Sequence, residues 1–210
     1  MNTALAPKKT SFKQQQMQFR ENAILDSVNR LLSQKGFDLM TMDEVAADVG
    51  IAKASLYKHF PSKESLAAAS MTRLLDHTLE QVNAAPSHLG PKEKLKSIVR
   101  WGIQLHIKGE MPYLPSTRSS IQQALMAHEP YIARLQELTA RLGDWIMQAQ
   151  DNGELSAALP GEVILYTIYA RACDPVADFL KLGGAFSDQD IVDLLVHTCF
   201  DGFVSPQKPR

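Results

Sequence analysis

Residues 41–63 have the sequence TMDEVAADVGIAKASLYKHFPSK, and this stretch decides the fold of the N-terminal part of the chain. Thr41 and Glu44 have the spacing of a capping box, in which each side chain accepts the backbone N–H of the other residue. Gly50 predicts the end of that helix, because glycine enters the left-handed conformation without a steric penalty. A second short helix follows at once and ends before Pro61. The stretch therefore predicts two short helices joined by a tight turn, and then the start of a third helix.

The second short helix, expected over residues 53–59, has an apolar side and a polar side. At about 100° per residue, Leu56 and Phe60 fall together and should face a core. The outer side carries small or basic residues with donors at its edges: Ala54, Ser55, Lys58, Lys53, Tyr57 and His59. Small side chains permit close approach to base edges, and the flanking donors can hold phosphates. These are the requirements of a recognition helix in a DNA major groove.

The distribution of charge along the chain also favours DNA binding by the N-terminal part. Residues 1–20 hold four basic residues and no acidic one. Residues 1–70 hold nine Lys/Arg and seven Asp/Glu, whereas residues 71–210 hold thirteen and sixteen. A basic N-terminal part and an acidic remainder are typical of a DNA-reading module joined to a part that does not touch DNA. The alternative is a solvated surface helix beside a basic tail. The agreement of caps, turn and helix face favours DNA binding.

The pattern G-[IV]-x-x-x-x-L-Y-x-H-F-x-x-K occupies residues 50–63 and resembles the DNA-binding domain of the TetR family of bacterial transcriptional regulators. The resemblance covers roughly residues 18–78, and the helix before the motif ends at Gly36. It implies an all-α chain, with an N-terminal three-helix helix-turn-helix domain followed by a larger helical-bundle domain for effector binding and dimerisation. Ala52 departs from the pattern, because the family often has a Ser or Thr there as N-cap. Losing a cap costs about 1 kcal/mol of helix stability.

The resemblance also implies particular contacts with DNA. Phosphate contacts are expected from Thr41, Tyr57 and Lys63. Positions at or near the bases are expected for Met42, Ala52, Lys53, Ala54, Ser55, Lys58 and His59. The partner is then a double-stranded, palindromic operator, because two recognition helices of a dimer lie about 34–36 Å apart and reach successive major grooves.

The sequence predicts helices to its end, without the period-2 alternation of strands. Four parts are expected. They are a flexible basic arm over residues 1–17, the DNA-binding domain over 18–78 with its motif at about 41–60, the effector-binding and dimerisation domain over 79–204, and a disordered tail over 205–210.

The C-terminal helices are predicted to be unusually apolar. Residues 161–182 are apolar nearly all round, and Asp174-Pro175 should kink or divide this helix. Ser187 and Asp190 resemble a capping box for a last helix. The last two helices either complete the monomer core or pair with a second copy in a four-helix interface. The weak DNA reading of a single short helix favours the homodimer.

The resemblance further implies a pocket for a small-molecule effector in the second domain. Candidate lining residues are aromatic or polar groups among aliphatic ones: Trp101, His106, Tyr113, Trp145, Tyr166, Tyr169 and Arg171. Each of these residues has an ordinary core position as its alternative. Arg171 lies in an apolar run and needs a partner, for which Asp174 or Asp178 on its own helix is preferred to an anionic ligand.

Other classes of function find little support in the sequence. It contains no G-x-S-x-G, H-E-x-x-H, P-loop or dinucleotide fingerprint, so an enzyme and a bound cofactor are not expected. Its six histidines have no metal-ligand spacing, so no metal site is expected. No apolar run reaches the length of a membrane span, and we expect a cytoplasmic protein. Cys173 and Cys199 are expected to be buried reduced thiols, with a redox-sensing pair as the alternative.

Together with these patterns, the resemblance to the TetR family implies a dimeric, ligand-responsive repressor that a small, mainly apolar effector releases from its operator. Two alternatives stay open. The first is a regulator of the same fold without a small-molecule effector, acting as an activator or through a protein partner. The second is a cavity-bearing enzyme or ligand carrier with a vestigial DNA-binding module.

Overall fold

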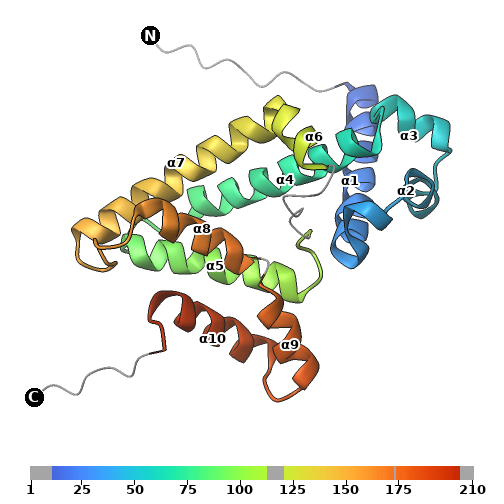
Figure 1. Cartoon of the computed structure of the whole chain (residues 1–210). Helices are drawn as coiled ribbons and strands as arrows, with labels where there is room; N and C mark the ends of the chain where they lie inside the picture. The colour runs from blue at the N-terminus through green and yellow to red at the C-terminus, as the bar shows by residue number, and fades with distance from the viewer. Residues whose placement is uncertain (1–10, 113–120, 173, 204–210) are drawn as a thin grey trace, which may run out of the picture.

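The computed structural model describes residues 11–112, 121–172 and 174–203, which form ten α-helices (Figure 1). The helices are α1 (Phe12–Leu39), α2 (Met42–Val49), α3 (Lys53–His59), α4 (Lys63–Ala84), α5 (Pro91–Ile107), α6 (Ile121–Ala127), α7 (Glu129–Asp151), α8 (Gly161–Ala172), α9 (Pro175–Gly183) and α10 (Asp188–Phe200). The described part of the chain contains no strand, and the all-α fold class is confirmed. The expectations for Tyr113, Cys173 and the tail 205–210 concern residues outside the described part.

Two hydrophobic cores organise the molecule. Helices α1, α2 and α3 and the start of α4 surround the first core, and α6 packs on it from the second domain. The second core lies among the rest of α4 and helices α5, α7, α8 and α10. Helix α4 contributes Leu66 and Met71 to the first core and Leu79 and Val82 to the second. This one long helix therefore connects the two domains, and in Figure 1 it runs beside α7.

Helix α1 begins earlier than the sequence interpretation placed it. Ser11 caps α1, since its hydroxyl accepts the backbone N–H of Gln14 while the Gln14 side chain accepts the N–H of Ser11. Residues 12–17, which we expected in a flexible arm, are therefore helical. Gly36 breaks the helical geometry with φ 74° and ψ 177°, as its position predicted, and one further turn carries the chain to Leu39.

The C-terminal helices begin and end where their caps predict. Asp174 caps α9, because its carboxylate accepts the backbone N–H of Val176 at 3.0 Å, and the break at this point separates α8 from α9. Ser187 and Asp190 form the expected capping box of α10. Among the described residues, no helix is both long and apolar enough to cross a membrane. The same residues contain no group of His, Cys, Asp and Glu side chains that could hold a metal ion.

Candidate nucleic-acid interface and ligand cavity

Predicted caps hold the turn between α2 and α3. The Thr41 Oγ1 accepts the backbone N–H of Glu44 at 3.3 Å, and a Glu44 carboxylate oxygen accepts the N–H of Thr41 at 3.0 Å. Gly50 ends α2 in the left-handed region with φ 72° and ψ 35°. Val45 on α2 and Leu56 on α3 are fully buried. Both short helices are therefore anchored by their inner faces, which leaves the opposite face of α3 in solvent.

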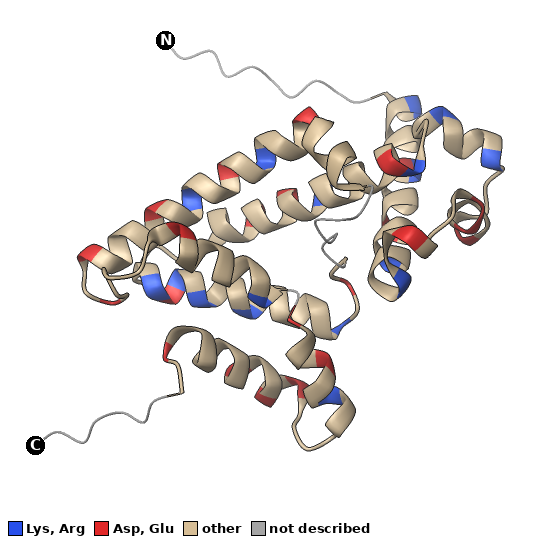
Figure 2. Ribbon diagram, in the orientation of Figure 1, with Lys and Arg blue, Asp and Glu red and all other residues tan. Residues whose placement is uncertain are grey.

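The outer face of α3 carries most of the predicted base-reading residues. Ala52, Lys53, Ala54 and Lys58 are exposed, and Ser55 is half-buried. Ala52 makes no side-chain cap, as its departure from the family pattern predicted. Figure 2 shows basic residues on α3 at the edge of the molecule and acidic residues on neighbouring α2. Small side chains at the centre and lysines beside them give this face the chemistry that major-groove recognition needs.

The two lysines of α3 differ in their surroundings. The Lys53 Nζ lies 2.8 Å from Oδ1 of Asp43 on α2. This hydrogen bond with Asp43 is the largest cause that raises the pKa of Lys53 above its ordinary value. Lys58 is exposed and has no hydrogen-bond or ion-pair partner in the described part of the chain. Lys58 is therefore available to a nucleic acid at once, whereas Lys53 must exchange the Asp43 carboxylate for a new acceptor.

Three predicted phosphate contacts lie at the margins of this face. Tyr57 is exposed on α3, and Thr41 is exposed at the start of α2, where its hydroxyl caps the helix. Lys63 begins α4, and its Nζ donates to the carbonyl oxygen of Asp38 at 3.1 Å. The same Nζ lies 4.3 Å from the centre of the Phe37 ring. These contacts fix the ammonium group of Lys63 at the surface near α3.

Two residues expected near the bases lie elsewhere. The Met42 residue is only 7% exposed and packs in the first core. Met42, Val45 and Ala46 have the i, i+3, i+4 spacing of one helix face, and that spacing was the signal that we overlooked. The His59 side chain is 12% exposed, and its Nδ1 lies 3.3 Å from Oε1 of Glu21 on α1. We therefore correct both positions to the domain interior and the α1–α3 contact.

A cavity of about 400 Å³ lies in the second domain between α4, α5, α7 and α8. Most of its lining is aliphatic, and the predicted residues Trp101, Tyr166 and Tyr169 belong to its wall. Thr139 and Tyr169 place their hydroxyl oxygens 3.1 Å apart. Burial raises the pKa of the Tyr169 phenol, which therefore stays neutral at ordinary pH. The cavity is thus apolar with a small polar patch, which is typical of a small-molecule site.

Three other predicted pocket residues do not line this cavity. Trp145 is buried in the second core, with the Lys94 Nζ 5.7 Å from its ring centre. His106 faces Asp178 of α9, with 3.1 Å between Nε2 and Oδ1. Arg171 forms an ion pair with Asp174, which was the preferred alternative for this residue.

The sequence interpretation also missed two polar residues of the cavity wall. Thr78 of α4 and Tyr131 of α7 line the cavity. Their helical register showed only that they lie on core-facing sides of long helices, not that a space lies in front of them.

The last three helices expose large apolar side chains. These are Val163 and Tyr166 on α8, Val176, Phe179 and Leu182 on α9, and Leu194 on α10. Phe179 is 72% exposed and Leu182 is 87% exposed. By contrast, Ile191 and Leu195 on the inner side of α10 are buried in the second core. The C-terminal helices therefore complete the monomer core with one side and leave apolar surface on the other.

The N-terminal domain of this chain is similar to known bacterial regulators. The model of the family described as "Bacterial regulatory proteins, tetR family" matches residues 24–70. The negative transcriptional regulator IcaR of the biofilm operon icaADBC in Staphylococcus aureus strain Newman is 42% identical over 57 residues, which are 27% of this chain and 31% of IcaR. The transcriptional regulator RutR of Escherichia coli K12 is 28% identical over 107 residues, which are 51% of this chain and 50% of RutR. The chain thus matches these curated relatives over only 31% and 50% of their lengths.

Solved structures match the fold of both domains. The structure of AibR in complex with isovaleryl coenzyme A and operator DNA has a TM-score of 0.64 and 25% identity, and the match covers 88% of this chain and 100% of that chain. A TetR-like regulator from Rhodococcus sp. RHA1 has a TM-score of 0.56 and 27% identity, with coverage of 87% and 94%. Residues 24–70 therefore match the DNA-binding domain of the TetR family of bacterial regulatory proteins, and the fold of both domains resembles that of TetR-like regulators.

Proposed function

We propose that this protein is a transcriptional repressor that binds a palindromic DNA operator as a homodimer and leaves it when a small, mainly apolar effector binds. The observation that carries the proposal is the exposed face of α3, where small residues and lysines stand on a capped and buried α2–α3 unit. Two relatives support it, because IcaR is a negative regulator and AibR binds operator DNA. Such a protein acts in the cytoplasm and needs no metal or cofactor.

Specific roles follow for the residues of the interface. Ala54, Ser55 and Lys58 would read base edges, because they form the outward centre of α3. Tyr57 and Lys63 would contact phosphates on either side and so fix the register of the helix in the groove. Lys53 would join them after it leaves Asp43. Thr41 would approach a phosphate at the start of α2, where the backbone N–H groups of the first turn also point outward.

A homodimer through α8 and α10 would cover part of the apolar surface that the C-terminal helices leave in solvent. Exposed apolar side chains on neighbouring helices are typical of a protein–protein interface. The inner side of α10 already belongs to the core, so the outer residues, such as Leu194, are the ones that remain for a second copy. Two-fold pairing would place two recognition helices on one face, as a palindromic operator requires.

The apolar cavity gives the effector a way to act on DNA binding. Leu74, Leu75 and Thr78 of α4 line the cavity, while Lys63 at the other end of the same helix lies beside α3. An effector that prefers a different position of α4 would move the recognition helices apart. The coupling is limited by the difference in effector affinity between the two states, typically about 1–3 kcal/mol. AibR was solved with isovaleryl coenzyme A, which makes an acyl group a suitable occupant of this cavity.

The experiment is a fluorescence-anisotropy titration of full-length protein against labelled duplexes that tile the region upstream of its own gene. One tile should bind more tightly than unrelated DNA. Lys58→Ala should reduce that preference, whereas Arg141→Ala on the exposed side of α7 should not change it. If no tile exceeds unrelated DNA even at low salt, a carrier or an enzyme with a vestigial DNA-binding module becomes the better hypothesis.

A further inference from the structure

The cavity between α4, α5, α7 and α8 has a wall of uncharged side chains. Among the described residues that line it, there is no Asp, Glu, Lys, Arg or His. Arg171 stands on α8 between the wall residues Tyr169 and Ala172. Its guanidinium is ion-paired with Asp174 and is therefore already neutralised. An ionised ligand group would lie in this apolar space without a counter-charge, which is strongly unfavourable.

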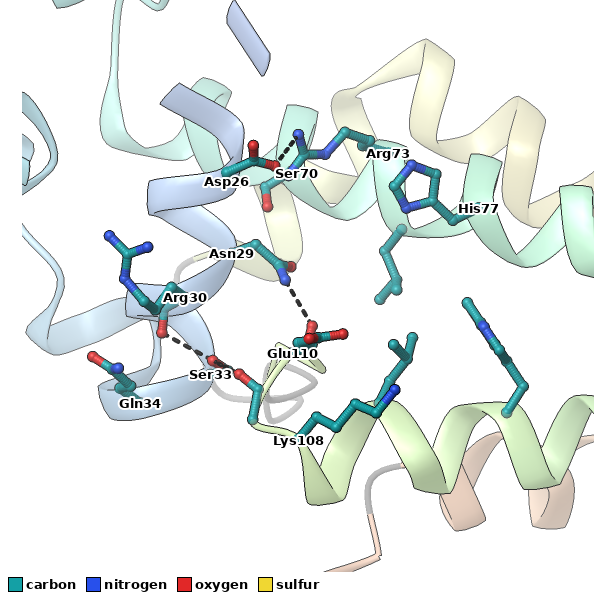
Figure 3. A pocket seen from close by; sticks show the side chains of 14 residues that line it. Asp26, Asn29, Arg30, Ser33, Gln34, Ser70, Arg73, His77, Lys108 and Glu110 are labelled. Atoms are coloured by element: carbon teal, nitrogen blue, oxygen red, sulfur yellow. Dashed lines mark hydrogen bonds and ion pairs between the residues drawn. The ribbon is translucent and has the colours of Figure 1, made fainter. Parts of the chain in front are cut away.

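A polar cleft formed by α1, α4 and the end of α5 borders the cavity. Leu74 and Trp101 line both spaces, so these two side chains form the boundary between them. In the described lining of the cleft, the Asp, Glu, Lys and Arg side chains balance one another (Figure 3): Arg30 is ion-paired with Asp48, Arg73 with Asp26, and Lys108 is matched by Glu110. These groups therefore give an anionic ligand in the cavity no net attraction.

The polar groups of the cavity wall are mainly hydroxyls. Thr78 donates its hydroxyl proton to the carbonyl oxygen of Leu74, one turn earlier on α4, at 2.8 Å. Thr139 differs, because its hydroxyl has no backbone partner in the described part of the chain and lies 3.1 Å from the hydroxyl of Tyr169. Two hydroxyls that share one hydrogen bond use only one of their two protons. The other proton is therefore left for an acceptor in the cavity.

Tyr131 supplies a second donor. It lines the cavity, and its hydroxyl has no hydrogen-bond partner among the described residues. Burial raises the pKa of Tyr131, and burial is also the largest cause that raises the pKa of Tyr169. Both phenols therefore stay protonated at neutral pH and can donate. Two donors in the wall of an apolar space match a ligand that carries an uncharged acceptor, such as a carbonyl oxygen.

The size and lining of the cavity favour an aromatic ligand of about two rings. An apolar cavity of about 150 Å³ holds one benzene molecule, and this cavity has about 400 Å³. Tyr166 and Tyr169 lie edge to face, with ring centres 6.5 Å apart and planes at 65°. Such rings favour further edge-to-face or offset contacts with an aromatic ligand. Met71 and Met111 also line the cavity, and their flexible side chains can adapt to a ring.

We propose that the effector is an uncharged, two-ring aromatic carbonyl compound, whose carbonyl oxygen accepts hydrogen bonds from the Thr139–Tyr169 hydroxyl pair and from Tyr131, and that the cavity excludes ionised carboxylates. The inference rests on the proposed function and names the ligand class of its effector site. Charge then decides which ligands bind. A ketone enters as it is, whereas an acid of the same size enters only in its protonated form.

Isothermal titration calorimetry of the full-length protein tests this inference with three probes: 2-acetylnaphthalene, 2-naphthoate and naphthalene. The ketone and the carboxylate have nearly the same size and differ in charge. At pH 7 only about one carboxyl group in 10³ is protonated, so 2-naphthoate should bind at least about a hundredfold more weakly than the ketone. Its affinity should rise about tenfold when the pH falls from 7 to 6, because the protonated fraction rises tenfold, while the affinity for the ketone stays constant.

A double variant tests the hydroxyl pair. Thr139→Val/Tyr169→Phe removes both hydroxyls and keeps the shapes of the side chains, so it should bind the ketone about fivefold more weakly, the effect of one neutral hydrogen bond. Naphthalene has no acceptor oxygen and should bind this variant as it binds the wild type, which also shows that the cavity is intact. The matched control Thr167→Val removes a hydroxyl from the exposed side of α8 and should change neither affinity.

Binding of 2-naphthoate at pH 7 as tight as that of the ketone, or an affinity for it that does not change with pH, would overturn the uncharged class. Equal affinity of the wild type and the double variant for the ketone would overturn the role of the hydroxyl pair. If neither the ketone nor naphthalene binds, the aromatic class is wrong. Failure of the ligand-free protein to bind any upstream duplex would instead reject the proposed function, so the two failures can be told apart.

Discussion

Replacing Lys63 by alanine should change both the salt dependence of DNA binding and the stability of the fold. If the Lys63 ammonium contacts a phosphate, its removal lowers the slope of log affinity against log salt by roughly 0.9 per protomer, or about 1.8 for a dimer. Between 50 and 200 mM salt, that difference in slope corresponds to about a tenfold change in the ratio of wild-type to variant affinity. The affinity loss should be similar for operator and unrelated duplexes, because phosphates carry no sequence information.

The stability effect follows from the two contacts that Lys63 makes within the protomer. Its hydrogen bond to the Asp38 carbonyl and its position over the Phe37 ring together contribute about 1–2 kcal/mol. For a chain of this size, a loss of 1 kcal/mol lowers the melting temperature by about 2–4 °C.

The assay combines anisotropy titrations at several salt concentrations with a thermal melt, and Arg141→Ala serves as the control. An unchanged slope would show that Lys63 is a structural residue only. An unchanged melting temperature would show that its contacts with Asp38 and Phe37 do not stabilise the fold.

Three further predictions concern stability. Ser27 is buried in α1, and its hydroxyl has no hydrogen-bond partner among the described residues, so Ser27→Ala should raise the melting temperature; a lower value would show that the hydroxyl is satisfied. Ala52 already has extended N-cap geometry with φ −67° and ψ 140°, so Ala52→Ser should stabilise α3 by about 1 kcal/mol, measured by urea unfolding. Hydrogen bonds from Ser187 lower the pKa of Asp190 below 3.8. The stability that these hydrogen bonds add to the folded protein is therefore present above pH 4, and it is lost as the pH falls through the lowered pKa of Asp190. Ser187→Ala should flatten the acid limb of a curve of unfolding free energy against pH. An acid limb that is unchanged in this variant would contradict the prediction.

Local hydrogen-bond chemistry explains why the helix-turn-helix could be predicted from the sequence. A capping box needs only Thr41 and Glu44, and the end of α2 needs only a glycine at residue 50, so neither depends on distant parts of the chain. The capping box of Ser11 and Gln14 has the same local character. It was missed because the basic residues around it were interpreted as a flexible arm.

The faces of short helices could be predicted only in part. Leu56 was correctly placed in the core, because the apolar period of α3 determines its inner side. His59 lies at the edge of that face, and its position depends on Glu21 of α1, a contact that no periodicity within α3 contains. Met42 shows the opposite case, since the period of α2 alone would have placed it in the core.

Cavities depend on the packing of several helices and were therefore the least predictable feature. The cavity needs four helices to leave a space, and aromatic content along the sequence does not locate that space. Tyr169 and Trp145 look equivalent in the sequence, yet only Tyr169 lines the cavity while Trp145 fills the core.

Native mass spectrometry of the full-length protein with its best-binding upstream duplex tests the central claim most directly. The account predicts a complex of two protomers with one duplex, and its loss when 2-acetylnaphthalene is added, with one ligand bound to each released protomer. A protein that binds the ligand but never the duplex, or that keeps the duplex at saturating ligand, would contradict it.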